Sequence, residues 1–211
     1  MPFFIFKEGS LFFYYLCTLL NILFPYYSYL FQTSIMQSFL SILRGINVGG
    51  QRKIKMDDLK KLYETLGFQA IQTYIQSGNI VFQAESDENL AEKIEIAIQQ
   101  QFGFEVPVLV RTRLELAKTV ADNPFLSKSD MLVDKLHVTF LNQKPSALLV
   151  EKINALDFQA DRFRIIERDV YIYCPESYGN SKLTNSFFET KLKTKATTRN
   201  WKTVNQLLDM M

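Results

Sequence analysis

The sequence is poor in the residues that many enzymes and metal proteins use for their chemistry. It contains one histidine, His137, and two cysteines, Cys17 and Cys174, among 211 residues. A single histidine excludes a site built from several histidine ligands, and the cysteines show no metal-site spacing. Two cysteines so far apart also do not suggest a disulfide framework, so a reducing compartment such as the cytoplasm fits better. We therefore expect a cytoplasmic protein without a bound metal, and the sequence indicates no cofactor.

A strong excess of one charge is also missing. The chain has 24 Lys and Arg residues against 22 Asp and Glu residues, a formal net charge of +2. This balance gives no general argument for nucleic-acid binding, although it leaves room for a local basic patch. Its hydrophobic content of 47% and charged content of 22% are ordinary for a globular protein. The length is sufficient for one large domain or two small ones.

The first 35 residues differ from the remainder. Leu11 to Phe31 is a run of 21 residues without a charge, rich in Leu, Phe, Tyr and Ile, and long enough to span a bilayer as a helix. Met36 then opens a new, strand-like pattern. We interpret residues 1–35 as an apolar extension produced by a start site that was assigned too early. The alternative is a genuine single-pass membrane anchor, and only then is a membrane a partner of this chain.

From Met36 the apolar periodicity switches repeatedly between strand and helix. Residues 37–43 read as a buried strand, and Ser77-Gly78-Asn79 reads as a hairpin turn between two short β-prone runs. The elements expected in this half are strands at 37–43, 68–76, 80–83 and 106–110 and helices at 56–66, 86–102 and 112–120. Their order is β-α-β-β-α-β, that of ferredoxin-like domains.

Asn123-Pro124-Phe125 interrupts the pattern, and the second half then follows a similar order. The elements expected there are a strand at 135–141, a helix at 146–156, a hairpin at 162–173 and helices at 182–192 and 200–210. The sequence therefore predicts an α+β fold of two related ferredoxin-like lobes with mainly antiparallel sheets. We place the lobes at residues 36–122 and 123–211.

Three polar stretches lie where the chain is expected to turn. They are Arg44-Gly45-Ile46-Asn47-Val48-Gly49-Gly50, Gln76-Ser77-Gly78-Asn79 and Thr197-Thr198-Arg199-Asn200-Trp201. Backbone amides of a glycine-containing loop between strand and helix can form a concave anion site. The first stretch lacks the spacing of a P-loop and of a dinucleotide fingerprint. The alternative is that its glycines only provide positive φ for a tight turn.

The third stretch carries the chemistry best suited to an anion. Arg199 offers a bidentate fork for phosphate or carboxylate, and Trp201 offers a ring for stacking on a base. The alternative for Trp201 is an anchor in the core. Ser181 and Lys182 are expected to open a helix, where a Ser-Lys pair can act as nucleophile and base. A helix cap with a solvated lysine explains the same pair.

Four blocks resemble the signature of one family. They are the stretch beginning at Arg44, Thr73-Tyr74-Ile75-Gln76-Ser77-Gly78-Asn79, Ser181-Lys182-Leu183, and Thr198-Arg199-Asn200-Trp201. By these blocks the chain, from about Met36 to Leu208, is similar to the mainly bacterial family catalogued as domain of unknown function 1697. The resemblance implies an α+β fold of two related lobes, and it implies no established activity, substrate or cofactor. Members of the family generally lack an N-terminal extension.

These observations predict a two-lobed protein that binds a phosphate-bearing ligand, either a small molecule such as a nucleotide or a nucleic acid, in a cleft between the lobes. The candidate site residues are Arg44, Asn47, Gly49, Gly50, Gln76, Ser181, Lys182, Arg199 and Trp201. One alternative is a hydrolase-like enzyme that uses Lys182 or His137 as its acid-base residue. Another is a protein-interaction module without a ligand, in which the polar blocks only stabilise turns.

Overall fold

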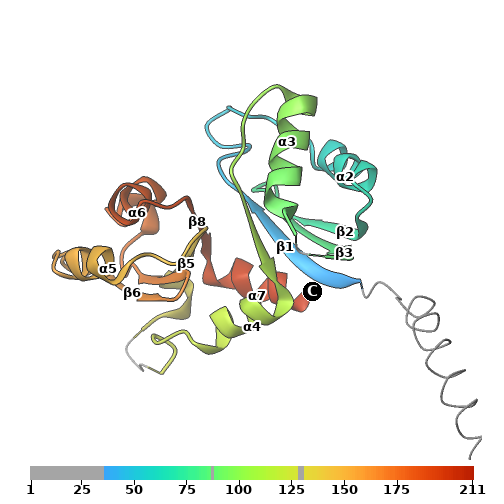
Figure 1. Ribbon diagram of the computed structural model, residues 1–211. Coiled ribbons are helices and arrows are strands. Elements are labelled where there is room, and N and C mark those ends of the chain that lie inside the picture. The colour runs from blue at the N-terminus through green and yellow to red at the C-terminus, as the bar shows by residue number, and fades with distance from the viewer. Residues whose placement is uncertain (1–35, 87, 128–130) are drawn as a thin grey trace, which may run out of the picture. The chain divides into compact units, whose positions relative to one another are not determined.

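The computed structural model describes residues 36–86, 88–127 and 131–211, and residues 36–211 form a compact unit (Figure 1). The predicted extension at residues 1–35, with its membrane-anchor alternative at Leu11 to Phe31, lies outside the described residues. Within those residues, every helix is too short or too polar to cross a membrane.

The first sheet contains four antiparallel strands in the order β2-β3-β1-β4. Its elements are β1 (Gln37–Leu43), α2 (Met56–Thr65), β2 (Gln69–Tyr74), β3 (Asn79–Ala84), α3 (Leu90–Phe102) and β4 (Val108–Thr112). The chain then enters α4 (Arg113–Ala121). Thr112 begins α4 with a capping box, because its side chain accepts from the backbone of Glu115 while the Glu115 carboxylate accepts from the backbone of Thr112.

The second sheet repeats this arrangement, with antiparallel strands in the order β6-β7-β5-β8. Its elements are β5 (Leu136–Leu141), α5 (Ala147–Asn154), β6 (Arg162–Ile166), β7 (Asp169–Tyr173), α6 (Asn185–Leu192) and β8 (Ala196–Asn200). α7 (Trp201–Asp209) follows β8 as α4 follows β4. The predicted α+β fold of two related lobes with antiparallel sheets is confirmed, and each lobe has the β-α-β-β-α-β order.

Alternation along β1 explains how one strand serves two cores. Phe39 and Leu43 face a core covered by α2 and α3, whereas Leu40 and Ile42 face a second core. That second core joins the inner faces of both sheets with side chains of α4 and α7, two helices whose ribbons lie side by side in Figure 1. A third core lies between the second sheet and the helices α5 and α6. The lobes therefore share one of the three apolar cores.

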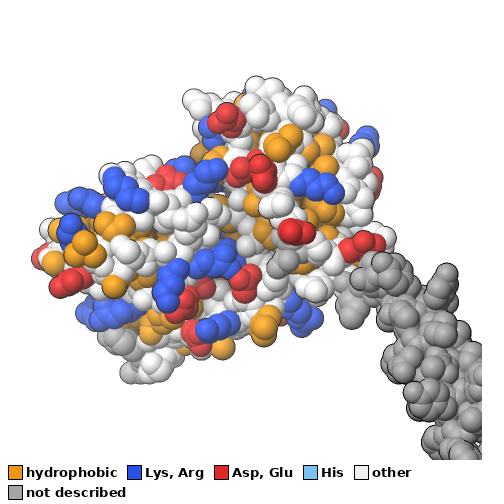
Figure 2. All heavy atoms as spheres, in the orientation of Figure 1, with side chains coloured by type: hydrophobic (Ala, Val, Ile, Leu, Met, Phe, Trp, Pro, Cys, Tyr) orange, Lys and Arg blue, Asp and Glu red, His pale blue; other side chains and the backbone are white. Residues whose placement is uncertain are grey.

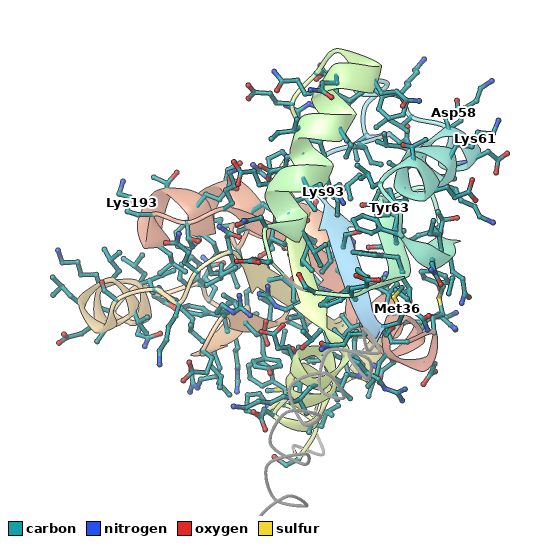
Figure 3. The ribbon with its side chains drawn as sticks, turned by 45° about the vertical axis from the view of Figure 1, so that its right-hand side comes forward. Met36, Asp58, Lys61, Tyr63, Lys93 and Lys193 are labelled. Carbon is teal, nitrogen blue, oxygen red and sulfur yellow. The ribbon has the colours of Figure 1, made fainter. Side chains whose placement is uncertain are left out.

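A buried hydrogen bond fixes α2 on the first sheet. Tyr63 is fully buried and its hydroxyl lies 2.8 Å from the hydroxyl of Ser41 on β1. Burial raises the pKa of Tyr63 above its usual value, so the phenol stays neutral and available for this bond. Figure 3 shows Tyr63 between its helix and the sheet, whereas Lys61 points outward from the same helix.

Three elements differ from the sequence prediction. β8 was not expected, because its polar residues were assigned to a turn before the last helix. The helix predicted at 182–192 begins only at Asn185, where Thr184 caps it, so Ser181 and Lys182 do not open it. The helix predicted at 86–102 begins at Leu90.

Candidate functional site

A cleft of about 880 Å³ lies where the loop after β1, the turn between β2 and β3, and strand β8 come together. Arg44, Ser77 and Arg199 all line it, one residue from each of the three polar stretches. Segments separated by more than a hundred residues thus meet at one surface hollow. Its far wall comes from the second lobe, through His137 of β5 and Tyr178 of the segment before α6.

The lining of this cleft carries charge of one sign. Among the described residues, it contains three arginines, Arg44, Arg52 and Arg199, and no aspartate or glutamate. The whole surface is not like this: on the face shown in Figure 2, cationic and acidic side chains are interspersed. The positive character is therefore local to the cleft, as expected of a site that attracts an anion.

Arg199 joins the two lobes by hydrogen bonds from every nitrogen of its guanidinium. Its Nε donates to Asn79 Oδ1 at 2.5 Å, and its Nη2 donates to the carbonyl oxygens of Leu43 and Ser77, both at 2.9 Å. Its Nη1 donates to Thr197 Oγ1 at 3.0 Å and to the carbonyl of Thr198 at 2.8 Å. A guanidinium has five N–H groups, and these five acceptors account for all of them. The bidentate fork predicted for a ligand is thus engaged by the protein.

All of these acceptors are neutral. Within the described residues, Arg199 makes no ion pair with a carboxylate. Burial lowers the pKa of Arg199 to about 10, and no acidic neighbour opposes this effect. The guanidinium is still charged at neutral pH, so an uncompensated positive charge lies beneath the floor of the cleft.

The other two arginines are more open. Arg44 has an Nη2 atom 2.7 Å from Oε2 of Glu189, with about a quarter of its side chain exposed (28%). Arg52 is exposed and makes no ion pair among the described residues. Its guanidinium lies beside Gly45, where an added Cβ would be 3.3 Å from Nη1. A side chain on residue 45 would crowd Arg52, so the glycine leaves room for this cation at the mouth of the cleft.

A network of hydroxyl groups forms the wall contributed by the second lobe. Thr198 Oγ1 lies 2.6 Å from Thr139 Oγ1, and it donates to Asn185 Oδ1 at 2.6 Å. The Tyr178 hydroxyl donates to the same Thr198 oxygen at 3.0 Å. The network holds the Tyr178 ring in place, and His137 stacks on that ring with 4.5 Å between centroids and 20° between planes.

His137 has the environment of a neutral, structural ring. Its Nδ1 lies 3.2 Å from the carbonyl oxygen of Lys135, a contact that requires Nδ1 to carry the proton. Burial lowers the pKa of His137 below its usual value, and the contact with the Lys135 carbonyl opposes this only in part. No carboxylate of the described residues bonds to the ring. The acid-base role considered for His137 therefore has no partner that would orient or activate it.

Asn47, Gly50 and Gln76 line a different hollow, of about 730 Å³, near the start of α2. The Asn47 amide closes the loop after β1: its Nδ2 donates to the carbonyls of Ile54 at 2.9 Å and Gln76 at 3.0 Å, and its Oδ1 accepts from the Ile54 amide at 2.9 Å. Asn47 thus ties the loop to the hairpin. Gly49 is exposed, with a φ of +58°.

Ser181 and Lys182 line a third hollow, of about 240 Å³, in the second lobe. Ser181 Oγ accepts from the Leu183 amide at 3.0 Å, so it closes a local turn. Lys182 is exposed and makes no hydrogen bond to Ser181. Within the described residues nothing activates this pair as nucleophile and base.

Trp201 is 5% exposed and belongs to the core shared by the two sheets, α4 and α7. Its ring therefore has no open face for a ligand, and the core anchor considered for it is what the structure shows. Of the nine candidate residues, only Arg44 and Arg199 line the cleft. Sequence reasoning missed Arg52 and Tyr178. Arg52 is a cation two residues after the double glycine, which was a signal available in the sequence.

Comparison with known proteins agrees with the architecture. The family model described as "Protein of unknown function (DUF1697)" matches residues 36–171. A solved structure, that of conserved bacterial protein SP0830 from Streptococcus pneumoniae, superposes with a TM-score of 0.65 at 22% identity, covering 83% of this chain and 99% of that chain. At this identity the likeness shows the fold alone. No curated protein matches the chain.

Proposed function

Because the chain belongs to the DUF1697 family, whose description assigns no activity, we propose its function from the cleft: it binds a phosphate-bearing small molecule, of the size of a nucleotide, beside Arg44, Arg52 and Arg199. The proposal concerns binding and includes no reaction. No pair of groups in the cleft has the arrangement of a nucleophile with its base.

The observation that carries the proposal is the unbalanced charge of the cleft. Three guanidinium groups and no carboxylate are among the described residues that line it. Arg44 is paired with Glu189, which is outside this lining, whereas Arg52 has no ion pair among the described residues and Arg199 has only neutral acceptors. A partly buried cation without a counter-ion is costly, and an anion bound above it reduces that cost. Phosphate suits such a site because it carries more negative charge than a carboxylate and presents several acceptor oxygens.

The three arginines would contribute differently. Arg52 has no ion-pair partner among the described residues, so its fork is available for a phosphate oxygen pair. Arg44 would share its guanidinium between Glu189 and the ligand. Arg199 would act through its charge, because its N–H groups are already donated to the protein.

A small ligand fits these observations better than an extended nucleic acid. The cleft, of about 880 Å³, is within the range of small-molecule sites. Binding of a long polynucleotide usually relies on a broad basic surface, whereas this chain has a net charge of only +2 and mixed charges on the face of Figure 2. The experiment below therefore distinguishes binding of a small phosphate compound from binding of nucleic acid.

Isothermal titration calorimetry with ADP, pyrophosphate and adenosine tests the proposal on the full chain. We expect ADP and pyrophosphate to bind and adenosine to bind much more weakly, because adenosine has no phosphate. Arg52→Gln should lower the affinity for ADP by about tenfold, the effect of losing one charge-assisted contact. The matched control is Arg162→Gln, an exposed arginine on β6 outside the cleft, and it should leave the affinity unchanged.

Two results would overturn the proposal. One is the absence of binding by either phosphate compound. The other is an equal loss of affinity in Arg52→Gln and Arg162→Gln, which would indicate non-specific attraction to surface charge. A single-stranded oligonucleotide that binds more tightly than ADP, with strong salt dependence, would assign the cleft to nucleic acid instead.

A further inference from the structure

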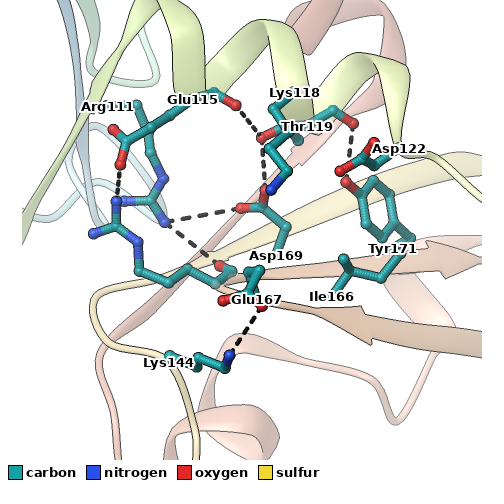
Figure 4. Close-up of a pocket in the computed structure, with 11 residues that line it drawn as sticks. Arg111, Glu115, Lys118, Thr119, Asp122, Lys144, Ile166, Glu167, Asp169 and Tyr171 are labelled. Carbon is teal, nitrogen blue, oxygen red and sulfur yellow. Dashed lines mark hydrogen bonds and ion pairs between the residues drawn. The ribbon is translucent and has the colours of Figure 1, made fainter.

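Another hollow, of about 280 Å³, lies between α4 and the β6–β7 hairpin (Figure 4). α4 and the β6–β7 hairpin provide most of its lining. In contrast to the cleft, its charges balance: four lining side chains are cationic, Arg111, Lys118, Lys144 and Arg168, and four are acidic, Glu115, Asp122, Glu167 and Asp169.

Most of these charges are paired within the protein. Arg168 pairs with Glu115 across the two lobes, and Lys144 pairs with Glu167 at 2.9 Å. Arg111 is 2% exposed and lies 3.8 Å from Asp169 through its Nη2 and Oδ1 atoms. That distance is too long for a hydrogen bond. The Nη2 atom of Arg111 instead donates to the carbonyl oxygen of Leu141 at 2.7 Å.

Three groups at the hollow are left without a hydrogen-bond partner among the described residues. Asp169 Oδ1 is buried and accepts no hydrogen bond, although Oδ2 of the same carboxylate accepts from Thr119 at 2.6 Å. The side chains of Lys118 and Asp122 make no hydrogen bond or ion pair within 4 Å in this part of the chain. Figure 4 shows Lys118, Asp122 and Asp169 around the same space.

We propose that this hollow is a second ligand site, separate from the cleft, that binds a small zwitterion carrying an ammonium group and a carboxylate, as a free amino acid does. The ammonium pairs with the Asp122 carboxylate, and the carboxylate of the ligand pairs with Lys118. The proposal is carried by these two side chains, one acidic and one cationic, which line the same hollow and make no hydrogen bond or ion pair with a described residue.

The chemistry of the lining selects this class of ligand. A simple anion would meet Asp169 and Asp122, and a simple cation would meet Arg111 and Lys118, so each alone is opposed by charge of its own sign. A zwitterion presents the correct sign to each end. The volume of about 280 Å³, at the lower end of the range for ligand sites, limits the occupant to a small molecule.

The experiment is a thermal-shift and calorimetric screen of the proteinogenic L-amino acids against the full chain. Each amino acid that binds is compared with its decarboxylated amine and its deaminated acid, which lack one of the two charges. We expect the amino acid to bind and both truncated compounds to bind at least tenfold more weakly. Lys118→Gln and Asp122→Asn should each lower the affinity at least tenfold, without loss of folding, because neither side chain makes a hydrogen bond or ion pair with a described residue.

The matched controls are Lys202→Gln and Asp209→Asn on α7, the helix that follows β8 as α4 follows β4; both side chains are exposed and outside the hollow. They should leave amino-acid binding unchanged, as should Arg52→Gln in the cleft. The proposal is overturned if no amino acid binds, if an amine or acid alone binds as tightly, or if the α4 and α7 variants behave alike. Because Arg52 is outside this hollow, failure here leaves ADP binding to the cleft unaffected.

Discussion

Arg111 and Arg199 occupy equivalent positions in the two lobes, and each donates hydrogen bonds to the other lobe. Arg111 on β4 is opposite Leu40 of β1, and Arg199 on β8 is opposite Val138 of β5. Each is the residue before the last of its strand. Each lobe therefore donates hydrogen bonds to the other from one arginine.

Their acceptors correspond as well. Arg111 reaches the carbonyls of Leu141 at 2.7 Å and Arg168 at 3.4 Å, the end of β5 and the turn after β6. Arg199 reaches the carbonyls of Leu43 and Ser77, both at 2.9 Å, the end of β1 and the turn after β2. The contacts differ at one point. β7 begins with Asp169 beside Arg111, whereas β3 begins with Asn79 beside Arg199. The first contact has a counter-charge and the second does not.

Replacing Arg199 should destabilise the fold strongly. Arg199→Met removes the donor to Asn79 Oδ1 and to the carbonyls of Leu43 and Ser77, which are partly buried. Unsatisfied buried acceptors are costly, so we expect the free energy of unfolding to fall by about 3–5 kcal/mol. Chemical denaturation measures the change. Arg52→Gln, an exposed arginine of the same cleft, should change stability by less than about 0.5 kcal/mol. Equal effects of the two variants would refute the structural role of Arg199.

Gly78 should tolerate no side chain. Its φ is +75°, and an added Cβ would lie 2.7 Å from the Cβ of Leu43 and 2.9 Å from Cδ1 of Ile46. We expect Gly78→Ala to lower the free energy of unfolding by about 3 kcal/mol or more, from backbone strain and overpacking together. Gly49→Ala is the matched control, since its φ is +58° but nothing lies within 4 Å of an added Cβ. In this variant the free energy of unfolding should fall by only about 1 kcal/mol, because alanine is strained in the left-handed conformation. A similar loss in both variants would mean that close packing at Gly78 contributes little.

His137 should titrate below the usual range for histidine. Burial lowers its pKa, and the stacked Tyr178 ring contributes to that burial. The neutral ring therefore contributes stability that is present above the ordinary histidine pKa and lost as the pH falls through the folded-state value. Because the chain has one histidine, a single NMR titration of its ring protons is unambiguous. Tyr178→Ala should raise the pKa toward 6.5, the usual value. An unchanged titration in this variant would contradict the assignment.

Asp169 should make stability depend on pH in the opposite direction to most carboxylates. Burial raises its pKa, while Arg111 and the bond from Thr119 only partly offset the effect. The contribution of Asp169 to the free energy of unfolding is thus greatest below the ordinary carboxyl pKa and declines as the pH rises through the folded-state value. We expect the stability of the wild type minus that of Asp169→Asn to decrease from acidic to neutral pH. The exposed Asp209→Asn is measured in parallel, and a difference that rises with pH for Asp169 would disprove the expectation.

Local patterns were sufficient for most of the fold. The run at residues 37–43 was predicted as a buried strand, and it forms β1, whose Phe39 and Leu40 enter different cores. The helix predicted at 112–120 forms α4, with Thr112 as its cap. β8 was missed because a run of Thr, Arg and Asn has the polarity of a turn. Thr197 is nevertheless buried, and Arg199 finds its acceptors in another lobe. No local pattern reports acceptors that are contributed by residues 156 positions away.

The candidate site was also predictable only in part, because its side chains have partners from distant parts of the sequence. A meeting of the three polar stretches in one cleft was predicted from their residue types, with Gln76 as the contributor from the second stretch. Ser77 lines the cleft instead, and Gln76 lines another hollow. Which side chains remain open to a ligand was not predicted, because this depends on the partners each finds in the folded chain. The guanidinium of Arg199 is engaged, that of Arg52 is free of ion pairs among the described residues, and the ring of Trp201 is in the core.

Through the reciprocal arginine contacts, each half of the chain provides hydrogen-bond acceptors for an arginine of the other half. In a polypeptide reduced to one half, the carbonyl at the end of the strand would lose its arginine donor. The arginine of that half would lose the acceptors that the other half contributes. Insertions in the turns that contain Ser77 and Arg168 would disturb this exchange, and loss of either half removes both directions at once. Each half of this protein therefore depends on the other for hydrogen bonds that it cannot make within itself.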